Sequence, residues 1–183
     1  MSLHDDPSDW DRCSVGFVDA VTDTHVRLRS ITTHGAEAGF EIRPLASITG
    51  VEQEDEDNDY LDKIRRLLAF DGPKRVRPWP MGDDPIRDAL HASMKSGQII
   101  SVWGHASDGF VLCGIVTMLG DDSAVIRTVD QYGENDGMAT VRLDTIRGID
   151  FATAEEQVKQ FLRQSYLRDG APLDSSSSRD VHR

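Results

Sequence analysis

Apolar and polar residues alternate along several short stretches of this chain, and this alternation predicts β-strands. Between residues 25 and 31, Val26 and Leu28 fall on one side, while Arg27 and Arg29 fall on the other, as in a half-buried strand. The same reasoning predicts eight more strands, over residues 13–21, 40–44, 47–51, 98–103, 110–119, 124–131, 138–143 and 145–151. Glycines at both ends of residues 34–39 predict a hairpin loop.

A different pattern, with apolar residues three or four positions apart, predicts three helices. One covers residues 60–70, where the apolar residues are Tyr60, Leu61, Ile64, Leu67 and Leu68. A second begins after Asp84 as N-cap, with Pro85 in its first turn, and ends before Gly97.

The third helix follows Thr153, which forms a capping box with Glu156. We expect this helix to bury Val158, Phe161 and Leu162.

The ten residues at the start of the chain are polar, and we expect them to be frayed. Residues 169–183 are poor in apolar side chains and are expected to be disordered.

The predicted strands belong to an internal duplication. Shifting the sequence by 98 positions aligns residues 16–52 with residues 114–150 and gives nine identities over 37 positions, among them Gly16 with Gly114 and Gly50 with Gly148. The duplication predicts a first unit at 1–70 and a second at 83–168, joined by a linker at 71–82 that is rich in proline and basic residues. We expect the two units to pack together, because strand edges left open in a small barrel favour pairing.

Two stretches of the second unit resemble the Sm-like family. Residues 108–129, DGFVLCGIVTMLGDDSAVIRTV, resemble the first Sm motif, and residues 145–151, TIRGIDF, resemble the second. The tandem pattern over residues 12–166 also resembles an uncharacterised bacterial two-repeat family. The resemblance implies an α+β, mainly β fold: two small Sm-like, SH3-like five-stranded barrels in tandem, each with an associated helix. TVRLDTIRGIDF is in addition similar to the end of the WYL domain, a ligand-sensing module of the same barrel type.

The Sm resemblance also designates a candidate loop site. It implies that Asp121 and Asp122, in the turn of the first motif, approach Arg147 and Gly148 in the second, where they could face a ligand or RNA. The asparagine of Sm-type RNA sites is missing near Ala124. The first half also reads Ile48, Thr49 and Gly50 where the second motif has arginine, so both departures argue against an RNA ring.

The overall charge disfavours nucleic acid and membranes as partners. The net charge is −12, and affinity for both depends on clustered lysine and arginine. The linker is basic, and Lys74, Arg75, Arg77 and Trp79 could stack on a base and contact phosphate. The alternative, which we favour, is that this linker lies across the two acidic units.

Nothing in the sequence indicates catalysis, a metal or a cofactor. The six histidines show no metal-ligand spacing, and the acidic run at 52–59 lacks the glycine and the final glutamate of a calcium loop. The two cysteines, Cys13 and Cys113, are expected to be buried free thiols. No segment has the pattern of a signal peptide or membrane span, so a cytoplasmic location is expected.

The sequence therefore predicts a non-enzymatic binding or adaptor protein without a cofactor. Its partner is expected to be a protein or a second copy of the chain, rather than RNA, DNA or a membrane. The alternative is an Sm-like regulator that associates with RNA or senses a ligand.

Overall fold

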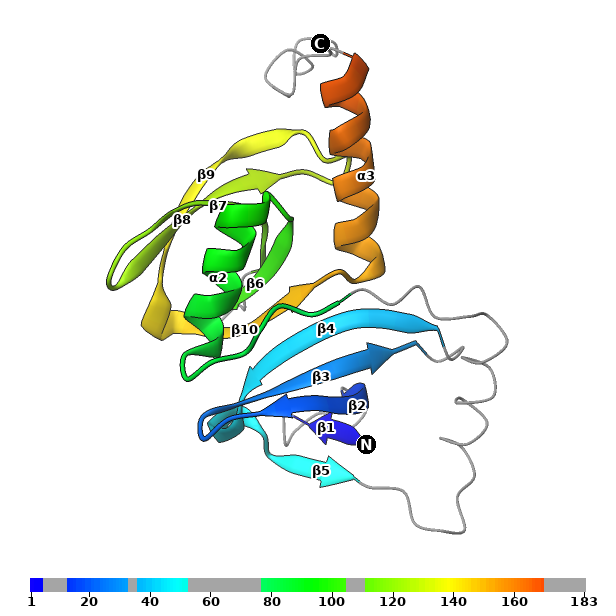
Figure 1. Ribbon diagram of the computed structural model, residues 1–183, viewed down its shortest axis with the longest axis vertical. Coiled ribbons are helices and arrows are strands. Elements are labelled where there is room, and N and C mark those ends of the chain that lie inside the picture. The colour runs from blue at the N-terminus through cyan, green and yellow to red at the C-terminus, as the bar shows by residue number, and fades with distance from the viewer. Residues whose placement is uncertain (5–12, 33–35, 53–76, 105–110, 170–183) are drawn as a thin grey trace, which may run out of the picture.

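The computed structural model describes residues 1–4, 13–32, 36–52, 77–104 and 111–169 (Figure 1). The strands of the first half are β1 (Ser2–His4), β2 (Cys13–Val21), β3 (His25–Ile31), β4 (Glu37–Pro44) and β5 (Gly50–Glu52). Those of the second half are β6 (Ile100–Gly104), β7 (Val111–Leu119), β8 (Ser123–Val129), β9 (Asn135–Arg142) and β10 (Ile146–Phe151). Helices α2 (Pro85–Ser96) and α3 (Ala154–Asp169) precede and follow the second set of strands, and short 3-10 turns η1 (Leu45–Ser47) and η2 (Leu143–Thr145) follow β4 and β9.

All ten strands form one open antiparallel sheet, in the order β5-β1-β2-β3-β4-β10-β6-β7-β8-β9. The prediction of two separate five-stranded barrels, each with a helix, is therefore wrong. The two halves merge because β4 pairs with β10, so an edge that would otherwise be open is satisfied by the other half. Both helices of the described residues belong to the second half, and the helix expected at 60–70 lies outside those residues.

The strand positions repeat with the same spacing as the sequence. β2, β3, β4 and η1 recur 98 residues later as β7, β8, β9 and η2 with matching lengths. The register shifts recur too, between Val18 and Ala20 in β2 and between Val116 and Met118 in β7. Strand β1, expected to be frayed, pairs with both β2 and β5. Because of this repeat, each residue of the first half can be compared with a counterpart in the second.

Two apolar clusters lie on opposite faces of the sheet. The larger surrounds Ile126, Val102 and Ile149 of the second half and also takes in Phe40 and Ile42 from β4. The smaller contains Leu3, Val26 and Leu28, with Met1 and Ile48 packed against it. Ile42 of β4 pairs with Ile149 of the larger cluster, whereas the preceding residue, Glu41, pairs with Leu28 of the smaller cluster. Because successive side chains of a strand point to opposite faces, the two clusters lie on opposite faces of the sheet.

Helix α2 has the boundaries that its caps predict. The Asp84 side chain accepts a hydrogen bond from Arg87 N, Pro85 stands in the first turn, and Gly97 adopts a φ of 69° at the C-terminal end. The helix buries Ile86, Ala89 and Leu90 against the larger cluster, and it packs on β7 and β10. The predicted start and end of this helix are therefore confirmed.

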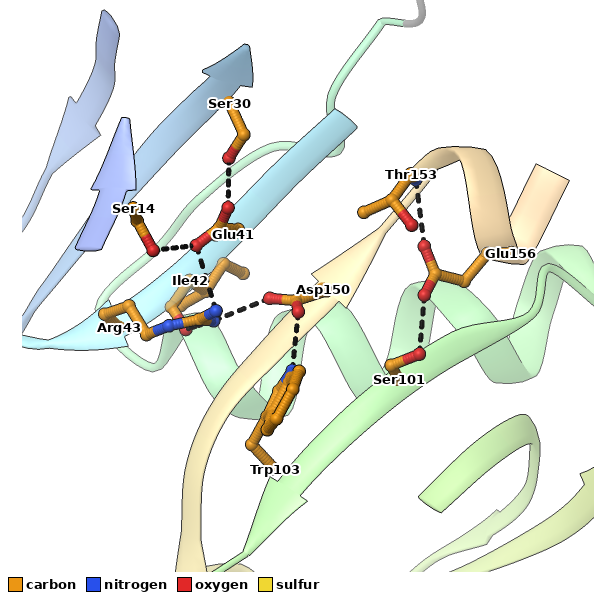
Figure 2. Close-up of polar contacts among 10 residues, drawn as sticks. All are labelled: Ser14, Ser30, Glu41, Ile42, Arg43, Ser101, Trp103, Asp150, Thr153 and Glu156. Atoms are coloured by element: carbon orange, nitrogen blue, oxygen red, sulfur yellow. Dashed lines mark hydrogen bonds and ion pairs between the residues drawn. The ribbon is translucent and has the colours of Figure 1, made fainter. Parts of the chain in front are cut away.

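Helix α3 begins where its capping box predicts but buries a different face. Thr153 N donates to Glu156 Oε2 at 2.9 Å, and Ser101 Oγ donates to the other carboxylate oxygen at 2.5 Å (Figure 2). The helix buries Glu156, Lys159 and Arg163 and exposes Val158 and Phe161, so the predicted apolar face is wrong. Polar groups of the sheet hold the buried face instead: the Arg163 guanidinium donates to Asn135 Oδ1 at 2.9 Å and to the Gly133 carbonyl at 3.4 Å.

The cysteines also differ from their prediction. Both are free thiols, as expected, but Cys13 is exposed and Cys113 is half-buried. Cys13 is the first residue of β2, where the side chain lies at the rim of the sheet. Burial raises the pKa of the Cys113 thiol, which keeps it neutral at physiological pH.

Candidate functional site

Two features of the first half could bind another molecule: a polar cluster at the junction of the halves, and an apolar surface on β2 and β5. The cluster arises from the register between β4 and β10. Asp150 is the pairing partner of Glu41, and the neighbouring pairs are Ile149 with Ile42 and Phe151 with Phe40. Because successive side chains alternate, the apolar pairs enter the larger cluster and the two carboxylates share the opposite face.

A guanidinium joins these two carboxylates (Figure 2). Arg43 Nη1 donates to Asp150 Oδ1 at 2.6 Å, and Arg43 Nη2 donates to Glu41 Oε2 at 2.9 Å. Trp103 Nε1, from β6, donates to the second oxygen of Asp150 at 2.5 Å. Only 11–15% of each of the three charged side chains is exposed, so these contacts are little screened by solvent.

Two serines complete the cluster on the Glu41 side. Ser14 Oγ, from β2, donates to Glu41 Oε2 at 2.5 Å, and Ser30 Oγ, from β3, donates to Glu41 Oε1. Glu41 thus accepts hydrogen bonds from three side chains on three strands, as Figure 2 shows. A carboxylate held in this way has a fixed position.

The electrostatics of Asp150 are dominated by its burial. Burial raises the pKa of this carboxyl to about 6, although the Arg43 guanidinium and the Trp103 hydrogen bond act in the opposite direction. The nearby Glu41 carboxylate raises the pKa further. The described contacts of the two carboxylates include one cation, so the cluster carries an excess negative charge above pH 6.

The second half has no such cluster at the corresponding positions. The counterparts of Ser14, Ser30, Glu41 and Arg43, 98 residues later, are Leu112, Thr128, Ala139 and Val141. Val141 is a buried member of the larger apolar cluster, and Leu112 packs against it. Positions that fill a core in one half therefore carry charge and hydroxyls in the other, which is typical of a site that serves binding rather than packing.

A cavity of about 290 Å³ opens beside the serines and Glu41. Its polar lining residues include Ser14, Ser30 and Glu41, and its apolar lining residues are Val15, Ile31 and Ala38. Cys13 and Thr32 also line it. A buried carboxylate beside a partly apolar cavity can orient a small ligand.

The second candidate feature is an apolar surface on β2 and β5. Val18, Val21 and Val51 are 42%, 59% and 54% exposed, although they share the sheet face of Leu3, Val26 and Leu28. We call these three valines the β2–β5 surface.

The counterparts of the β2–β5 surface are covered in the second half. They are Val116, Leu119 and Ile149, of which Val116 is 1% exposed and Ile149 is fully buried. Helix α2 packs on β7 and β10, the counterparts of β2 and β5. Val51 in addition lacks the outer strand that β4 provides for Ile149, because β5 is an end of the sheet. Across the described residues, neither helix buries the β2–β5 surface.

A larger cavity, of about 410 Å³, lies between the end of α2 and α3. Its walls include Gln98, Gln157, Gln160 and Gln164. Gln160 Oε1 accepts from Ile99 N at 2.9 Å, and Gln157 Nε2 donates to the carbonyl of Ala152 at 2.6 Å. The Gln160 amide joins α3 to the residue that precedes β6, and the Gln157 amide bonds to the turn before α3, so we assign this cavity a structural role.

The loop residues singled out by the sequence lie on the exposed surface of the second half. Asp121 and Asp122 are exposed in the β7–β8 turn, where the Asp122 carbonyl accepts from Leu143 N at 2.8 Å. Arg147 is exposed on β10, and Gly148 is buried next to it. Among the described residues, no hydrogen bond or ion pair joins Arg147 to either aspartate. Gly148 has a structural role, because a Cβ there would lie 2.9 Å from the backbone carbonyl oxygen of Ile42.

The linker residues are only partly described, since Lys74 and Arg75 lie outside the described residues. Arg77 is exposed, but the ring of Trp79 stacks on Phe151 at 4.3 Å between centroids. The Trp79 carbonyl accepts a hydrogen bond from Arg27 Nη1 at 2.5 Å. Trp79 therefore packs against the larger cluster, where it is not positioned to stack on a base.

Three residues of the cluster, Glu41, Arg43 and Asp150, were not predicted from the sequence, because each reads as the solvent-facing residue of a half-buried strand. A signal was nevertheless present. Aligning the two halves shows charged residues at 41 and 43 where the second half has Ala139 and Val141. Such a comparison would have pointed to β4.

Comparisons with known proteins give no relative for this chain: no family model, no curated protein and no solved structure matches it. Within the described residues, no group of three or more histidine, cysteine or acidic side chains could hold a metal ion. None of the described helices is long and apolar enough to cross a membrane.

Proposed function

We propose that this protein is a non-enzymatic binding module whose β2–β5 surface accepts an amphipathic helix from a protein partner. The observation that carries this proposal is the contrast within the chain. The second half covers Val116 and Ile149 with α2 and the β4 strand, whereas the equivalent Val18 and Val51 are exposed. A partner helix with an apolar stripe like that of α2 would bury these valines in the same way.

The charges near this surface indicate the character of the partner helix. Asp23, in the turn that follows β2, is exposed. The whole chain carries a net charge of −12. A helix with basic residues flanking its apolar stripe therefore gains affinity and a faster association rate. RNA is the less favoured partner for the same electrostatic reason, since its phosphates would be repelled. The proposal keeps the cytoplasmic location expected from the sequence.

A peptide with the sequence of α2 provides the test. The probe is a fluorescein-labelled peptide of residues 83–98 with Asp88→Lys, titrated into the full chain and followed by fluorescence anisotropy. We expect a Kd on the order of 100 µM, because the contact buries about three valines and two apolar side chains of the peptide. Val18→Asp should weaken binding at least tenfold.

Val111→Asp is the matched control for Val18→Asp. Val111 lies at the start of β7 with a similar exposure of 46%, away from the β2–β5 surface, so this variant should bind the peptide as the unmodified chain does. Equal binding by Val18→Asp, or no binding at 1 mM peptide, would refute the proposal.

Two other results would assign the surface to a different occupant. If Ile64→Asp with Leu68→Asp tightens peptide binding, residues 60–70 of this chain already cover the surface. A dimer in sedimentation that Val18→Asp dissociates would assign the surface to a second copy. Either result overturns the assignment to a partner protein.

A further inference from the structure

The hydrogen bonds beside the 290 Å³ cavity leave Ser14, Ser30 and Glu41 with no donor for a ligand. A serine hydroxyl has one hydrogen and two lone pairs. Ser14 and Ser30 both direct that hydrogen to Glu41, so their oxygens can only accept from a molecule in the cavity. Glu41 is itself an acceptor. These three residues therefore offer lone pairs and a negative charge, and they are suited to a ligand group rich in N–H donors.

The charge of the cluster gives the same answer. Glu41 and Asp150 share the Arg43 guanidinium, and their described contacts include no second cation. A positively charged ligand would balance the excess negative charge, whereas a carboxylate or phosphate would meet the Glu41 carboxylate. An ammonium group supplies three N–H donors and one charge in a compact form.

The apolar lining residues of the cavity limit what can be attached to the ammonium group of the ligand. Val15, Ile31 and Ala38 are apolar, and a volume of about 290 Å³ is at the lower end of the usual size of ligand pockets. A short aliphatic chain can lie against these side chains. A second charged group would face no counter-charge among these apolar residues.

From these observations we propose that the cavity beside Glu41 binds a small aliphatic compound with one primary ammonium group. The ammonium lies against Ser14, Ser30 and Glu41, and the alkyl chain lies against Val15, Ile31 and Ala38. This site is independent of the β2–β5 surface. The corresponding position in the second half, with Leu112 and Ala139, cannot bind an ammonium in this way.

The test is a calorimetric titration of the full chain with n-butylamine hydrochloride at pH 7.5 and constant ionic strength. Titrations with n-butanol, sodium butyrate and potassium chloride separate the contributions of shape and charge. We expect butylamine to bind with a Kd on the order of 1 mM, in keeping with the limited affinity that five heavy atoms allow. Butanol, butyrate and potassium should bind at least tenfold more weakly. Similar binding of butylamine and butanol, or of butylamine and potassium, would overturn the proposal.

Variants of the two halves provide matched controls. Glu41→Gln keeps the shape of the side chain and removes its charge, and it should weaken butylamine binding at least tenfold. Ser30→Ala removes one acceptor and should weaken binding several-fold, whereas Thr128→Ala, its counterpart in the second half, should have no effect. If Glu41→Gln fails to fold, Ser14→Ala and Ser30→Ala decide the matter. Unchanged binding in both serine variants would refute the site.

The exposed thiol of Cys13 gives an independent readout. Cys13 lines the cavity, so bound butylamine should slow its reaction with a maleimide, while the half-buried Cys113 serves as the internal reference. Slowing that Glu41→Gln abolishes supports the site. Equal reaction rates with and without saturating butylamine would contradict it.

Discussion

Replacing Asp150 with asparagine should change how the stability of the protein depends on pH. Burial raises the pKa of the Asp150 carboxyl from 3.8 to about 6, and its side chain is 11% exposed. A carboxyl with a higher pKa in the folded chain stabilises the fold fully below pH 3.8, and this contribution disappears as the pH rises through 6. A shift of this size corresponds to about 3 kcal/mol in total. Between pH 7.5 and pH 5, about half of it should be regained.

The assay compares the free energies of unfolding of the unmodified chain and Asp150→Asn, from urea titrations at several pH values between 5 and 7.5. The difference between the two proteins cancels the titration of all other groups. It should move in favour of the unmodified chain by about 1–2 kcal/mol as the pH falls.

Asp144→Asn is the control for this comparison. Asp144 pairs with Arg142 on the surface, where both side chains are more than 60% exposed, so its removal should leave the pH dependence unchanged. If the difference for Asp150→Asn instead moves against the unmodified chain on acidification, the Arg43 pairing dominates over burial and our reasoning is wrong.

Three further predictions concern the second half. Asp84→Ala should lower the free energy of unfolding by about 1 kcal/mol, measured by urea denaturation, because the helix loses its N-cap; an effect near zero would contradict the cap. Gly148→Ala should destabilise the chain by about 1–3 kcal/mol, because the new Cβ would lie 2.9 Å from the backbone carbonyl oxygen of Ile42. Gly120→Ala, with its nearest neighbour at 3.4 Å, should cost far less in the same denaturation assay. Oligouridine RNA should bind no more tightly than about 10⁻⁴ to 10⁻⁶ M at physiological salt in an anisotropy titration. A nanomolar constant that Arg147→Ala abolishes would establish an RNA site.

The elements that depend on local sequence were predictable. The bounds of β2 and β3 follow from alternation and turn residues, and those of α2 follow from Asp84, Pro85 and Gly97. The pairing of β4 with β10 was not predictable in the same way. It joins residues more than 100 positions apart, and no local pattern specifies which of several open edges a strand will meet. The single sheet therefore came from the structure alone.

The buried face of α3 shows a second limit of sequence reasoning. Helical periodicity favours burying Val158 and Phe161, and it treats Lys159 and Arg163 as solvent-facing. In the structure the two cations are buried, because Arg163 finds oxygen acceptors on the β8–β9 loop and β9, and Lys159 finds Glu155 one turn away. Hydrophobicity alone cannot anticipate partners that the tertiary structure brings in. The candidate site at Glu41 and Arg43 was missed for the same reason.

The two halves join through β4 of the first half and β10 of the second. The counterparts of these two strands, β9 and β5, are the end strands of the sheet. A further copy could in principle add to β9 or β5 in the same head-to-tail manner, and such growth does not terminate unless it closes into a ring. The chemistry of the junction is, however, not repeated there. Val141 stands where Arg43 would be needed, and Glu52 stands in place of Asp150, so a copy-to-copy junction would bring a carboxylate to the contact without its guanidinium. Divergence of the two halves at these positions therefore leaves a copy-to-copy junction without the ion pair that Arg43 and Asp150 form between β4 and β10.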